Sequence, residues 1–362
     1  MMNTTFNLLP MTTFRWTKSN ATEMEVLPPE EAVGARAVWS GDIERVTAAQ
    51  DKQAEAIWQA QRREFRGASP ETLAAALGSE SERFSVQVAA GETADLRVDV
   101  TLRHDALNWL GLIVVQLEPQ AQLHLTIALS AEDEGGQINY GLIADLAEDA
   151  RLTVTKVHTG KECMTTIEHR YTALAERAEA EYLAAEFGAR RVVYHGDADL
   201  RGDESAISEE CIYIGTHDEH IDLYYDRNQY GKRSRSHLAT YGALRDSSKK
   251  VFRGCIDFKR GASGSVGNEE DYVILLSDRV KNVSLPLLLC TEDDVQGNHA
   301  SSSGQIDKER MFYLMTRGFS KEDAKRMVVE AMLRPAIDRI AADDLRANVL
   351  HAVAQKMDVT DK

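Results

Sequence analysis

The chain has 362 residues and a formal net charge of -16, with 42 basic and 58 acidic side chains. This surplus of negative charge repels phosphate backbones, so nucleic acid is not an expected partner. No apolar run approaches the roughly 18 residues that a membrane span needs. The opening of the chain lacks the basic and apolar segments of a secretory signal. We therefore expect a cytoplasmic protein with no membrane partner.

Four cysteines, Cys163, Cys211, Cys255 and Cys290, are spread along the chain without a C-x-x-C pair. This spacing argues against a disulfide framework, a zinc ribbon and a self-contained iron-sulfur cluster. Strand alternation predicts that Cys255 faces outward, whereas Cys290 replaces an aliphatic residue and is expected in the core. The pattern G-x-x-x-x-G-K-[ST] is missing, so nucleotide energy would have to come from another subunit.

The first part of the chain has a helical composition. From residue 28 to about residue 77 glycine is rare and Ala, Glu, Gln and Arg are frequent. Apolar residues such as Val38, Val46, Ile57 and Trp58 are separated by charged ones. This composition is typical of helices. We predict a helical N-terminal region over residues 1–84.

From Phe84 onward apolar and polar residues alternate, as in LRVDVTL and QLHLTIAL. Such alternation predicts half-buried strands. A small residue opens an alternating run at Ala121, Ala150, Ala178 and Ser205, at steps of 29, 28 and 27 residues. A repeat of this length predicts a solenoid whose coils each hold two strands joined by polar turns. We therefore predict a mainly β chain with a β-helix core over residues 85–305; alternation leaves its hand undetermined.

After Gly304 the pattern returns to helix, over residues 306–362. Asp307 can cap a first helix that Gly318 ends. Pro335 should kink or divide the second helix. Such helices can serve as the solenoid's own cap.

One face of the second C-terminal helix is apolar. Met327, Val328, Ala331 and Met332 recur at helical spacing. A face of this kind can offer a groove or ridge to a partner. These four residues are the candidate partner-binding residues.

His217, His220 and Asp222 in GTHDEHIDLYY form the most metal-like group. His220 and Asp222 fall on one face of a strand whose other face carries Ile221 and Leu223. A cupin-like metal enzyme would use such a set. The polar outward face of a half-buried strand explains the same pattern and is the preferred interpretation.

A longer pattern connects the solenoid to the C-terminal helices. SDRVKNVSLPLLLCTEDDVQGNHASSSGQIDKERMFYLMTRG holds a proline-led strand, an acidic DDV turn, a histidine, G-Q-I-D, F-Y-L and R-G. It resembles the C-terminal signature of the SufB/SufD family of iron-sulfur cluster assembly scaffold proteins. HIDLYYDRNQYGKRSRSHLATYGALRDSSKKVFRGCIDFKRGAS resembles the family's central coils, and the opening FNLLPMTTFRWTKSN is similar to the start of many D-branch members. Residues 85–205 match only in the style of the repeat.

Within that family the chain is most similar to the D branch. His299 is followed by Ala300, where the B branch has glutamate, and Val280 stands where the B branch carries a cysteine. Both departures argue against cluster ligation by this chain alone. Gly297 replaces a cysteine found in many D-branch members, and Glu269 stands where glutamine is common.

The resemblance implies a right-handed parallel β-helix that pairs edge to edge with a SufB-type subunit through the coils after Asp278. It also implies that the C-terminal helices dock a SufC-type ABC ATPase. The expected role is iron entry during assembly of a nascent iron-sulfur cluster, with a reduced flavin sometimes found on the complex. His299 is then the candidate metal and cofactor-binding residue, in a turn beside Asp293 and Asp294. No tightly bound cofactor and no catalytic residue are expected.

Several alternatives stay open at the level of sequence. One is a cluster-bearing SufB-like subunit, and another is the cupin-like metal-dependent enzyme. A third is a plain β-helix binding module that forms homodimers, and a homodimer also stays open for the scaffold when it is alone. Only the scaffold interpretation demands an ABC-type ATPase among the proteins that the chain retains.

Overall fold

A computed structural model describes residues 2–9, 14, 18–28, 34–48, 65–161 and 163–358. The strands are β1 (Met2–Phe6), β2 (Thr22–Val26), β3 (Ala37–Gly41), β4 (Val46–Ala48), β5 (Glu82–Val88), β6 (Thr93–Leu102), β7 (Asn108–Leu117), β8 (Gln122–Ala131), β9 (Gln137–Leu146), β10 (Arg151–Gly160), β11 (Cys163–Leu174), β12 (Glu179–Glu186), β13 (Ala189–Leu200), β14 (Ala206–Gly215), β15 (His220–Gln229), β16 (Arg235–Leu244), β17 (Lys249–Phe258), β18 (Ser265–Leu275), β19 (Lys281–Cys290) and β20 (Val295–Gly304). The helical segments are η2 (Ile43–Arg45), α2 (Pro70–Ala76), α3 (Lys308–Thr316), α4 (Lys321–Asp338) and α5 (Asp343–Asp358).

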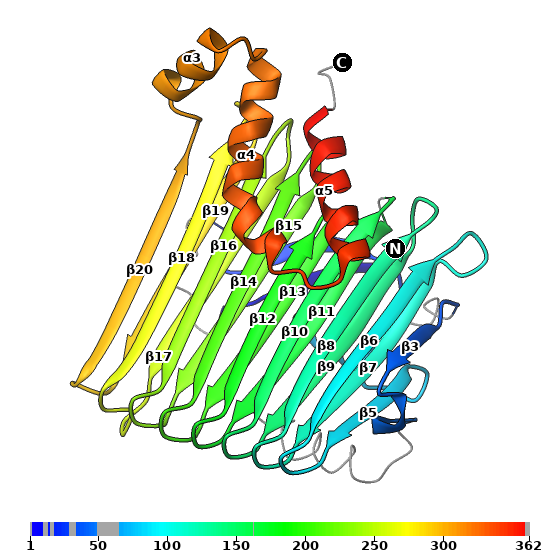
Figure 1. The fold of residues 1–362 in the computed structure, drawn as a ribbon, viewed down its shortest axis with the longest axis vertical. Helices are drawn as coiled ribbons and strands as arrows, with labels where there is room; N and C mark the ends of the chain where they lie inside the picture. Colours follow the sequence, from blue (N-terminus) through cyan, green and yellow to red (C-terminus); the bar gives the residue numbers. More distant parts are fainter. Residues whose placement is uncertain are drawn as a thin grey trace.

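From β5 onward the chain alternates between two sheets that lie face to face (Figure 1). The odd sheet runs in the order β19-β17-β15-β13-β11-β9-β7-β5, and the even sheet in the order β20-β18-β16-β14-β12-β10-β8-β6. Each coil adds one strand to each sheet, and successive strands pair in parallel. The predicted parallel β-helix core is therefore confirmed.

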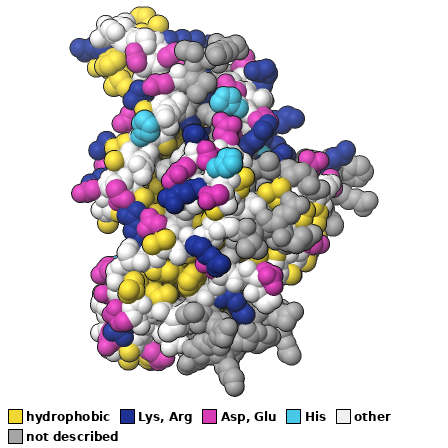
Figure 2. Space-filling model, turned by 90° about the vertical axis from the view of Figure 1, so that its right-hand side faces the viewer, with side chains coloured by type: hydrophobic (Ala, Val, Ile, Leu, Met, Phe, Trp, Pro, Cys, Tyr) yellow, Lys and Arg dark blue, Asp and Glu magenta, His cyan; other side chains and the backbone are white. Residues whose placement is uncertain are grey.

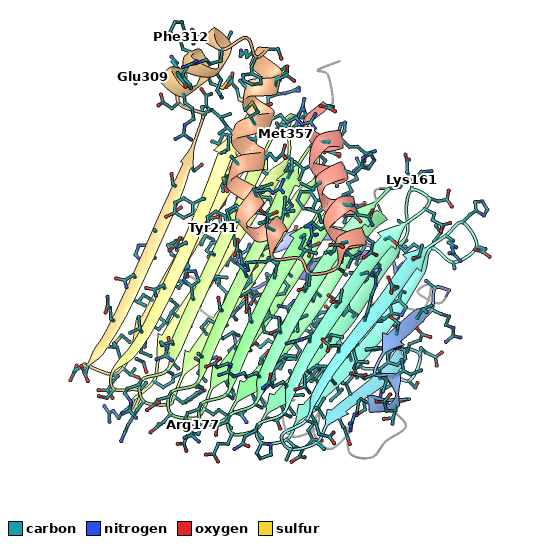
Figure 3. All side chains as sticks on the ribbon, viewed as in Figure 1. Lys161, Arg177, Tyr241, Glu309, Phe312 and Met357 are labelled. Atoms are coloured by element: carbon teal, nitrogen blue, oxygen red, sulfur yellow. The ribbon has the colours of Figure 1, made fainter. Side chains whose placement is uncertain are left out.

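One rim of the solenoid is a ladder of tight turns. Asp149 and Arg177 occupy equivalent turns of successive coils and have left-handed φ values of 59° and 54°. The Asp149 N–H donates to the Glu176 carbonyl at 3.0 Å, and the Arg177 N–H donates to the Asp203 carbonyl at 2.9 Å. Figure 3 shows Arg177 on this rim. Each of these turns is hydrogen-bonded to the equivalent turn of the next coil. Successive coils therefore contain nearly the same number of residues, and this explains the repeat in the sequence.

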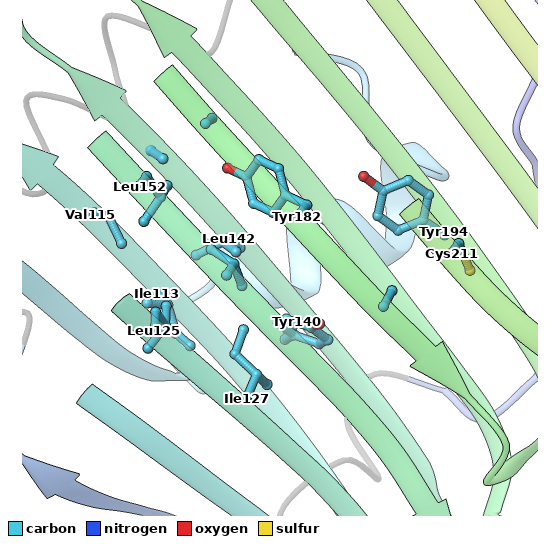
Figure 4. Packing of buried hydrophobic residues seen from close by; sticks show 14 of the residues in the cluster. Ile113, Val115, Leu125, Ile127, Tyr140, Leu142, Leu152, Tyr182, Tyr194 and Cys211 are labelled. Carbon is cyan, nitrogen blue, oxygen red and sulfur yellow. The ribbon is translucent and has the colours of Figure 1, made fainter. Parts of the chain in front are cut away.

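Inward-facing side chains fill the lumen between the two sheets (Figure 4). In the early coils they are mostly aliphatic, and Leu125, Ile127 and Leu142 are at most 1% exposed. Aromatic side chains lie there too, as Tyr140 shows, and Tyr182 and Tyr194 continue them into the later coils. The alternation read from the sequence is the alternation between lumen and outer face.

The C-terminal helices cover the outer face of the even sheet. Val329 and Leu333 of α4 and Val349 of α5 are buried against Val157 and Ile212 of that sheet. Figure 1 shows α4 and α5 lying across the upper part of the sheet, with α3 beyond the strand ends. These two helices therefore cover a side of the solenoid and do not close its end.

The N-terminal segments cover the outer face of the odd sheet. β1 and β2 pair antiparallel, and Phe6 and Val26 pack against Ile167 and Val193. The short helix α2 packs on β7 and β9 through residues such as Leu73. Both outer faces are thus covered by chain ends, whereas the lumen is filled by the coils themselves.

The predicted helical region over residues 1–84 is wrong at β1, β2, β3 and β4, which are strands. β3 pairs antiparallel with β6, and β4 pairs antiparallel with β5. Pairing with the first coil overrides local composition there, because that coil would otherwise expose an open edge. Helix does occur at α2, where the Ser69 hydroxyl accepts from the Thr72 N–H. Ile57 and Trp58 lie outside the described residues.

The C-terminal helices follow the predicted boundaries. Asp307 caps α3 by accepting a hydrogen bond from the Glu309 N–H at 3.0 Å. Gly318, at φ 96°, follows the end of α3. Pro335 lies inside α4, which continues to Asp338, so it does not divide the helix. Among the described residues, every helix is too short or too polar to cross a membrane.

Candidate functional site

In the described part of the chain, β19 and β20 form the last coil of the solenoid. β19 pairs with β17 and β20 pairs with β18, and within the described part of the chain neither has a partner on its other edge. Such an edge presents N–H and C=O groups that can pair with a strand of another chain. Pro286, which lacks a donor, lies within β19 as expected for an edge strand. The structure therefore has an open edge after Asp278 among its described residues, and pairing of this edge with another subunit stays a prediction.

His299 lies within β20 and not in the predicted turn. It is in register with Glu269 of β18, so both side chains point to the lumen face of the even sheet. Neighbouring strands are about 4.8 Å apart. His299 is exposed, because no further coil of the described residues covers this face. The small residues of GNHASSSGQ resemble a loop, but pairing with β18 extends them into a strand.

The acidic residues before β20 belong to the turn ladder. Asp293 and Asp294 lie in the connection between β19 and β20. The Ser263 hydroxyl donates to Asp294 Oδ2 at 2.7 Å, and the Gly264 N–H donates to the Asp294 carbonyl at 2.6 Å. Asp294 therefore holds the turn between β19 and β20 by hydrogen bonds to the turn between β17 and β18.

A row of buried charged side chains lies in the lumen between β10 and β15. Lys156 contacts Glu168, the Arg170 Nε donates to Glu168 at 2.8 Å, and a second Arg170 nitrogen donates to Glu209 at 2.8 Å. Glu209 also pairs with Arg227. These five side chains are at most 3% exposed. Burial alone would raise the pKa of Glu168, but Arg170 and Lys156 hold it below its ordinary value. We call this set the luminal file.

We call the open end of the lumen, at β17 to β20, the mouth. Buried acidic and basic side chains do not pair one to one there. Lys250 donates to Asp271 Oδ1 at 2.5 Å, and the Thr240 hydroxyl donates to the same oxygen at 2.6 Å. Glu269, two residues earlier on the same face, is 4% exposed. Burial and the neighbouring Asp271 carboxylate raise the pKa of Glu269 to about 8. Since Lys250 bonds Asp271 and Arg227 bonds Glu209, Glu269 has no ion-pair partner among the described residues.

The metal-like group of the sequence does not form a ligand set. Asp222 is fully buried and accepts hydrogen bonds from Asn7 at 2.7 Å and Arg253 at 2.6 Å. His217 lies in a turn with φ 50°. Burial lowers the pKa of His220 to about 4. The face points outward, as the preferred interpretation held, but the N-terminal segment covers it. Across the described ranges no three His, Cys, Asp or Glu side chains are placed to hold a metal.

The face predicted for Cys255 is correct, but its exposure is not, and the prediction that Cys290 lies in the core is wrong. Cys255 does face away from the lumen but is only 2% exposed, and its burial raises the pKa of the thiol. Cys290 is exposed, because it ends β19 at the mouth, where no coil formed by the described residues covers it. Cys211 lies in the lumen. Alternation assigns a residue to a face, but it does not say what covers that face.

The apolar row of α4 lines an open pocket. Met327, Val328, Ala331 and Met332 face α3 and the ends of β18 and β20 across a volume of about 720 Å³. Tyr313 and other residues of α3 form the opposite wall. The predicted apolar row is therefore accessible, in contrast to the buried face of α4 that packs on the even sheet.

Helix α3 adds an exposed apolar surface to this pocket. Phe312 is 70% exposed, Tyr313 56% and Met327 40%. Figure 3 shows Phe312 at the tip of α3, away from the sheets, and Figure 2 shows hydrophobic side chains gathered at that end of the molecule. Large exposed apolar side chains that cluster in this way mark an interaction surface.

The described residues thus form a parallel β-solenoid with an open edge, an exposed histidine on that edge and an apolar pocket between α3 and α4. Residues 101–332 match the family model described as SUF system FeS cluster assembly, SufBD core domain. The chain therefore belongs to the SufBD family, which confirms the resemblance seen in the sequence.

Curated relatives agree with this assignment at low identity. The iron-sulfur cluster assembly protein SufD of Bacillus subtilis is 21% identical over 254 residues, covering 70% of this chain and 55% of that protein. SufB of the same organism is 22% identical over 213 residues, covering 59% of this chain and 43% of SufB. A SufBD family protein of Pyrococcus horikoshii is 25% identical over 197 residues, with 54% and 44% covered. The chain spans about half the length of these relatives.

Sequence reasoning missed the luminal file and the unmatched Glu269. Glu168 and Arg170 lie two residues apart in TTIEHRYTAL, so a strand assignment places both on one face. Their register neighbours on β9, Tyr140 and Leu142, are luminal, which marks this face as the inner one. Charged residues at inward positions of an otherwise apolar repeat were the signal that could have revealed the file.

Proposed function

We propose that this chain is a non-catalytic, SufD-type scaffold subunit of a cytoplasmic SUF complex. It pairs with a SufB-type subunit, engages a SufC-type ABC ATPase, and aids iron entry and nascent cluster formation at the interface. Iron and the nascent cluster are cargo in this proposal, and no cofactor is held tightly. Besides family membership, the observation that carries it is the open end of both sheets with His299 exposed on it.

The open end suits a partner of the same architecture. A second β-helix that presents its own last coil can continue both sheets by strand addition, which satisfies the edge groups of β19 and β20. His299 would then lie at the junction of the two lumens. Imidazole is a borderline ligand that can hold iron without retaining it.

The test of this site is His299→Ala in the co-expressed complex. The side chain is exposed, so we expect an unchanged melting temperature and intact complex formation. The cluster yield, measured from visible absorbance and iron content, should fall severely. Asn298→Ala, on the opposite face of β20, is the matched control. A normal cluster yield in His299→Ala would refute the role.

The ATPase is proposed to dock on the pocket between α3 and α4. One face of α4 and one face of α5 are buried against the even sheet, and the large hydrophobic side chains of the C-terminal helices that stay exposed lie on α3 and in the α4 row. Deleting residues 306–362 would uncover that sheet, and surface substitutions are the cleaner test.

The double variant Phe312→Ser and Met327→Ser should lose the ATPase in a pull-down while keeping its melting temperature. Tyr230→Ser provides the control, because Tyr230 is 42% exposed and lies between β15 and β16, far from α3 in the sequence and outside the pocket. Undiminished ATPase capture by the double variant would contradict the docking assignment.

The rival functions have less support. Val280 and Ala300 disfavour a cluster-bearing B-type subunit. The cupin-like enzyme would need His217, His220 and Asp222 as ligands, but Asp222 is engaged by Asn7 and Arg253.

A further inference from the structure

The mouth of the lumen contains buried oxygen acceptors that no described residue satisfies. Glu269 is 4% exposed, and its carboxylate receives no hydrogen bond from the described part of the chain. Asp271 is 1% exposed; its Oδ1 binds Lys250 and Thr240, while its Oδ2 is buried without a donor among the described residues. The Ser284 Oγ of β19 is buried and equally unsatisfied there. Buried acceptors without donors are costly and rare, so each calls for an explanation.

Strand register places these groups on the inner faces of the last two coils of the solenoid. Glu269 and Asp271 lie on the inward face of β18, and Ser284 lies on the inward face of β19, in register with the luminal Phe252. The Glu269 carboxylate extends across the lumen to Gly254 of β17, where a Cβ atom would lie 2.2 Å from its oxygen. The glycine at this position therefore leaves room for the carboxylate.

We propose that Glu269 and Asp271, with the Ser284 hydroxyl, form a luminal site for one divalent, oxygen-preferring cation of the Fe²⁺ and Mn²⁺ class. Two carboxylates and a hydroxyl match the hard ligands that such cations take, and water completes the coordination. The site rests on the proposed function only for its choice of iron as the natural cation.

The position of the site gives it a role in cation entry. His299 is the register neighbour of Glu269 on the solvent side, so a cation that enters through the mouth meets the imidazole first and the carboxylates second. Asp271 Oδ1 is paired with Lys250, so only the Glu269 carboxylate and Asp271 Oδ2 are left as charged ligands for the cation. Few ligands make the site weak and exchangeable, as suits a cation that must be passed on.

The experiment is an Mn²⁺ titration of the full-length, chelator-treated chain, with free Mn²⁺ measured by electron paramagnetic resonance. We expect the wild type to bind one Mn²⁺ and Glu269→Gln to bind it at least about tenfold more weakly. Glu270→Gln is the matched control, because Glu270 is on the same strand with its side chain on the outer face, near the Tyr241 hydroxyl at 3.4 Å. Glu269→Gln removes an unmatched charge and should fold normally, which a thermal melt verifies.

Equal Mn²⁺ binding by Glu269→Gln and wild type would overturn the site, as would no binding by the wild type. His299→Ala separates this inference from the proposed function. If that variant assembles clusters normally while Glu269→Gln still loses Mn²⁺, the cation site stands and the proposed role of His299 fails. If His299→Ala loses clusters while Glu269→Gln binds Mn²⁺ normally, the reverse holds.

Discussion

The lumen has two halves that share one backbone geometry and differ in what fills them. One inward column of the even sheet reads, from early to late coils, Val98, Ile127, Lys156, Ala184, Cys211, Thr240 and Asp271. Its first two residues are aliphatic, whereas Lys156 and Asp271 are buried ions. Because the same coil is built with either filling, the fold does not require the charges.

This difference has an energetic meaning. Burying an ion pair removes two charges from water, and well-packed apolar residues at such positions are often equally or more stabilising. The early coils show that apolar residues fit this lumen. The charged half faces the open end, so its charges are better explained by the function of that end than by stability.

Breaking the luminal file should have the largest effect on stability. Arg170→Met leaves Glu168 and Glu209 without the cation that they share. We expect a loss of about 3 to 5 kcal/mol of unfolding free energy, measured by chemical or thermal denaturation. Arg190→Met removes an exposed rim arginine and is the control. A loss no greater than that of the control would show that the file is not energetically coupled.

The apolar half should respond to lost volume and not to lost charge. Leu125→Ala removes a luminal side chain that is 1% exposed, and we expect a loss of about 3 kcal/mol from transfer and cavity terms. Leu125→Met, which keeps the volume, should lose less than about 1.5 kcal/mol. Similar losses for both variants, measured by denaturation, would show that this half is not tightly packed.

The unmatched Glu269 should make stability depend on pH. Its folded-state pKa of about 8 lies above the ordinary value of 4.5. Its contribution is therefore complete below the ordinary pKa and is lost as the pH rises through the folded-state value. Glu269→Gln lacks this titration. The melting temperature of this variant minus that of the wild type should therefore increase as the pH rises from about 5 to about 8. If the melting temperatures of the two proteins change in parallel with pH, Glu269 is not an unpaired buried carboxylate.

The rim charges should matter least. Arg177 contacts Glu148, Asp149 and Glu176 at the surface, where solvent and salt screen the charges. Arg177→Ala should therefore show no measurable shift in melting temperature at physiological salt. A shift as large as that of Arg170→Met would remove the distinction between buried and rim charges.

Much of the architecture could be predicted from local patterns. The inward positions Val98, Leu125 and Ile127 were assigned correctly because alternation is enforced by each strand's own geometry. Asp307 and Gly318 marked the bounds of α3 for the same local reason. The strands β3 and β4 could not be predicted, since their pairing with β6 and β5 is a contact between segments far apart in the chain.

The candidate site was predictable only in part. His299 was singled out by its motif, and the row from Met327 to Met332 by helical spacing, and both are accessible. Burial of Asp222 and Cys255 could not be predicted, because their faces are outward and are covered by other parts of the fold. The exposure of Cys290 depends likewise on the absence of a coil above β19 in the described chain.

The sequence by itself determined which residues alternate, where the coils repeat and where the terminal helices begin and end, since these depend on interactions within a few residues. The family could be inferred from the sequence for the same reason, because its signature is a continuous stretch of the chain. The tertiary structure alone decided which coil is the last, which faces the chain ends cover, and that Glu269 and Asp271 lie together at the open mouth. Those features depend on strand register and on neighbours from distant segments, because a charge is matched or unmatched only by what packing places around it.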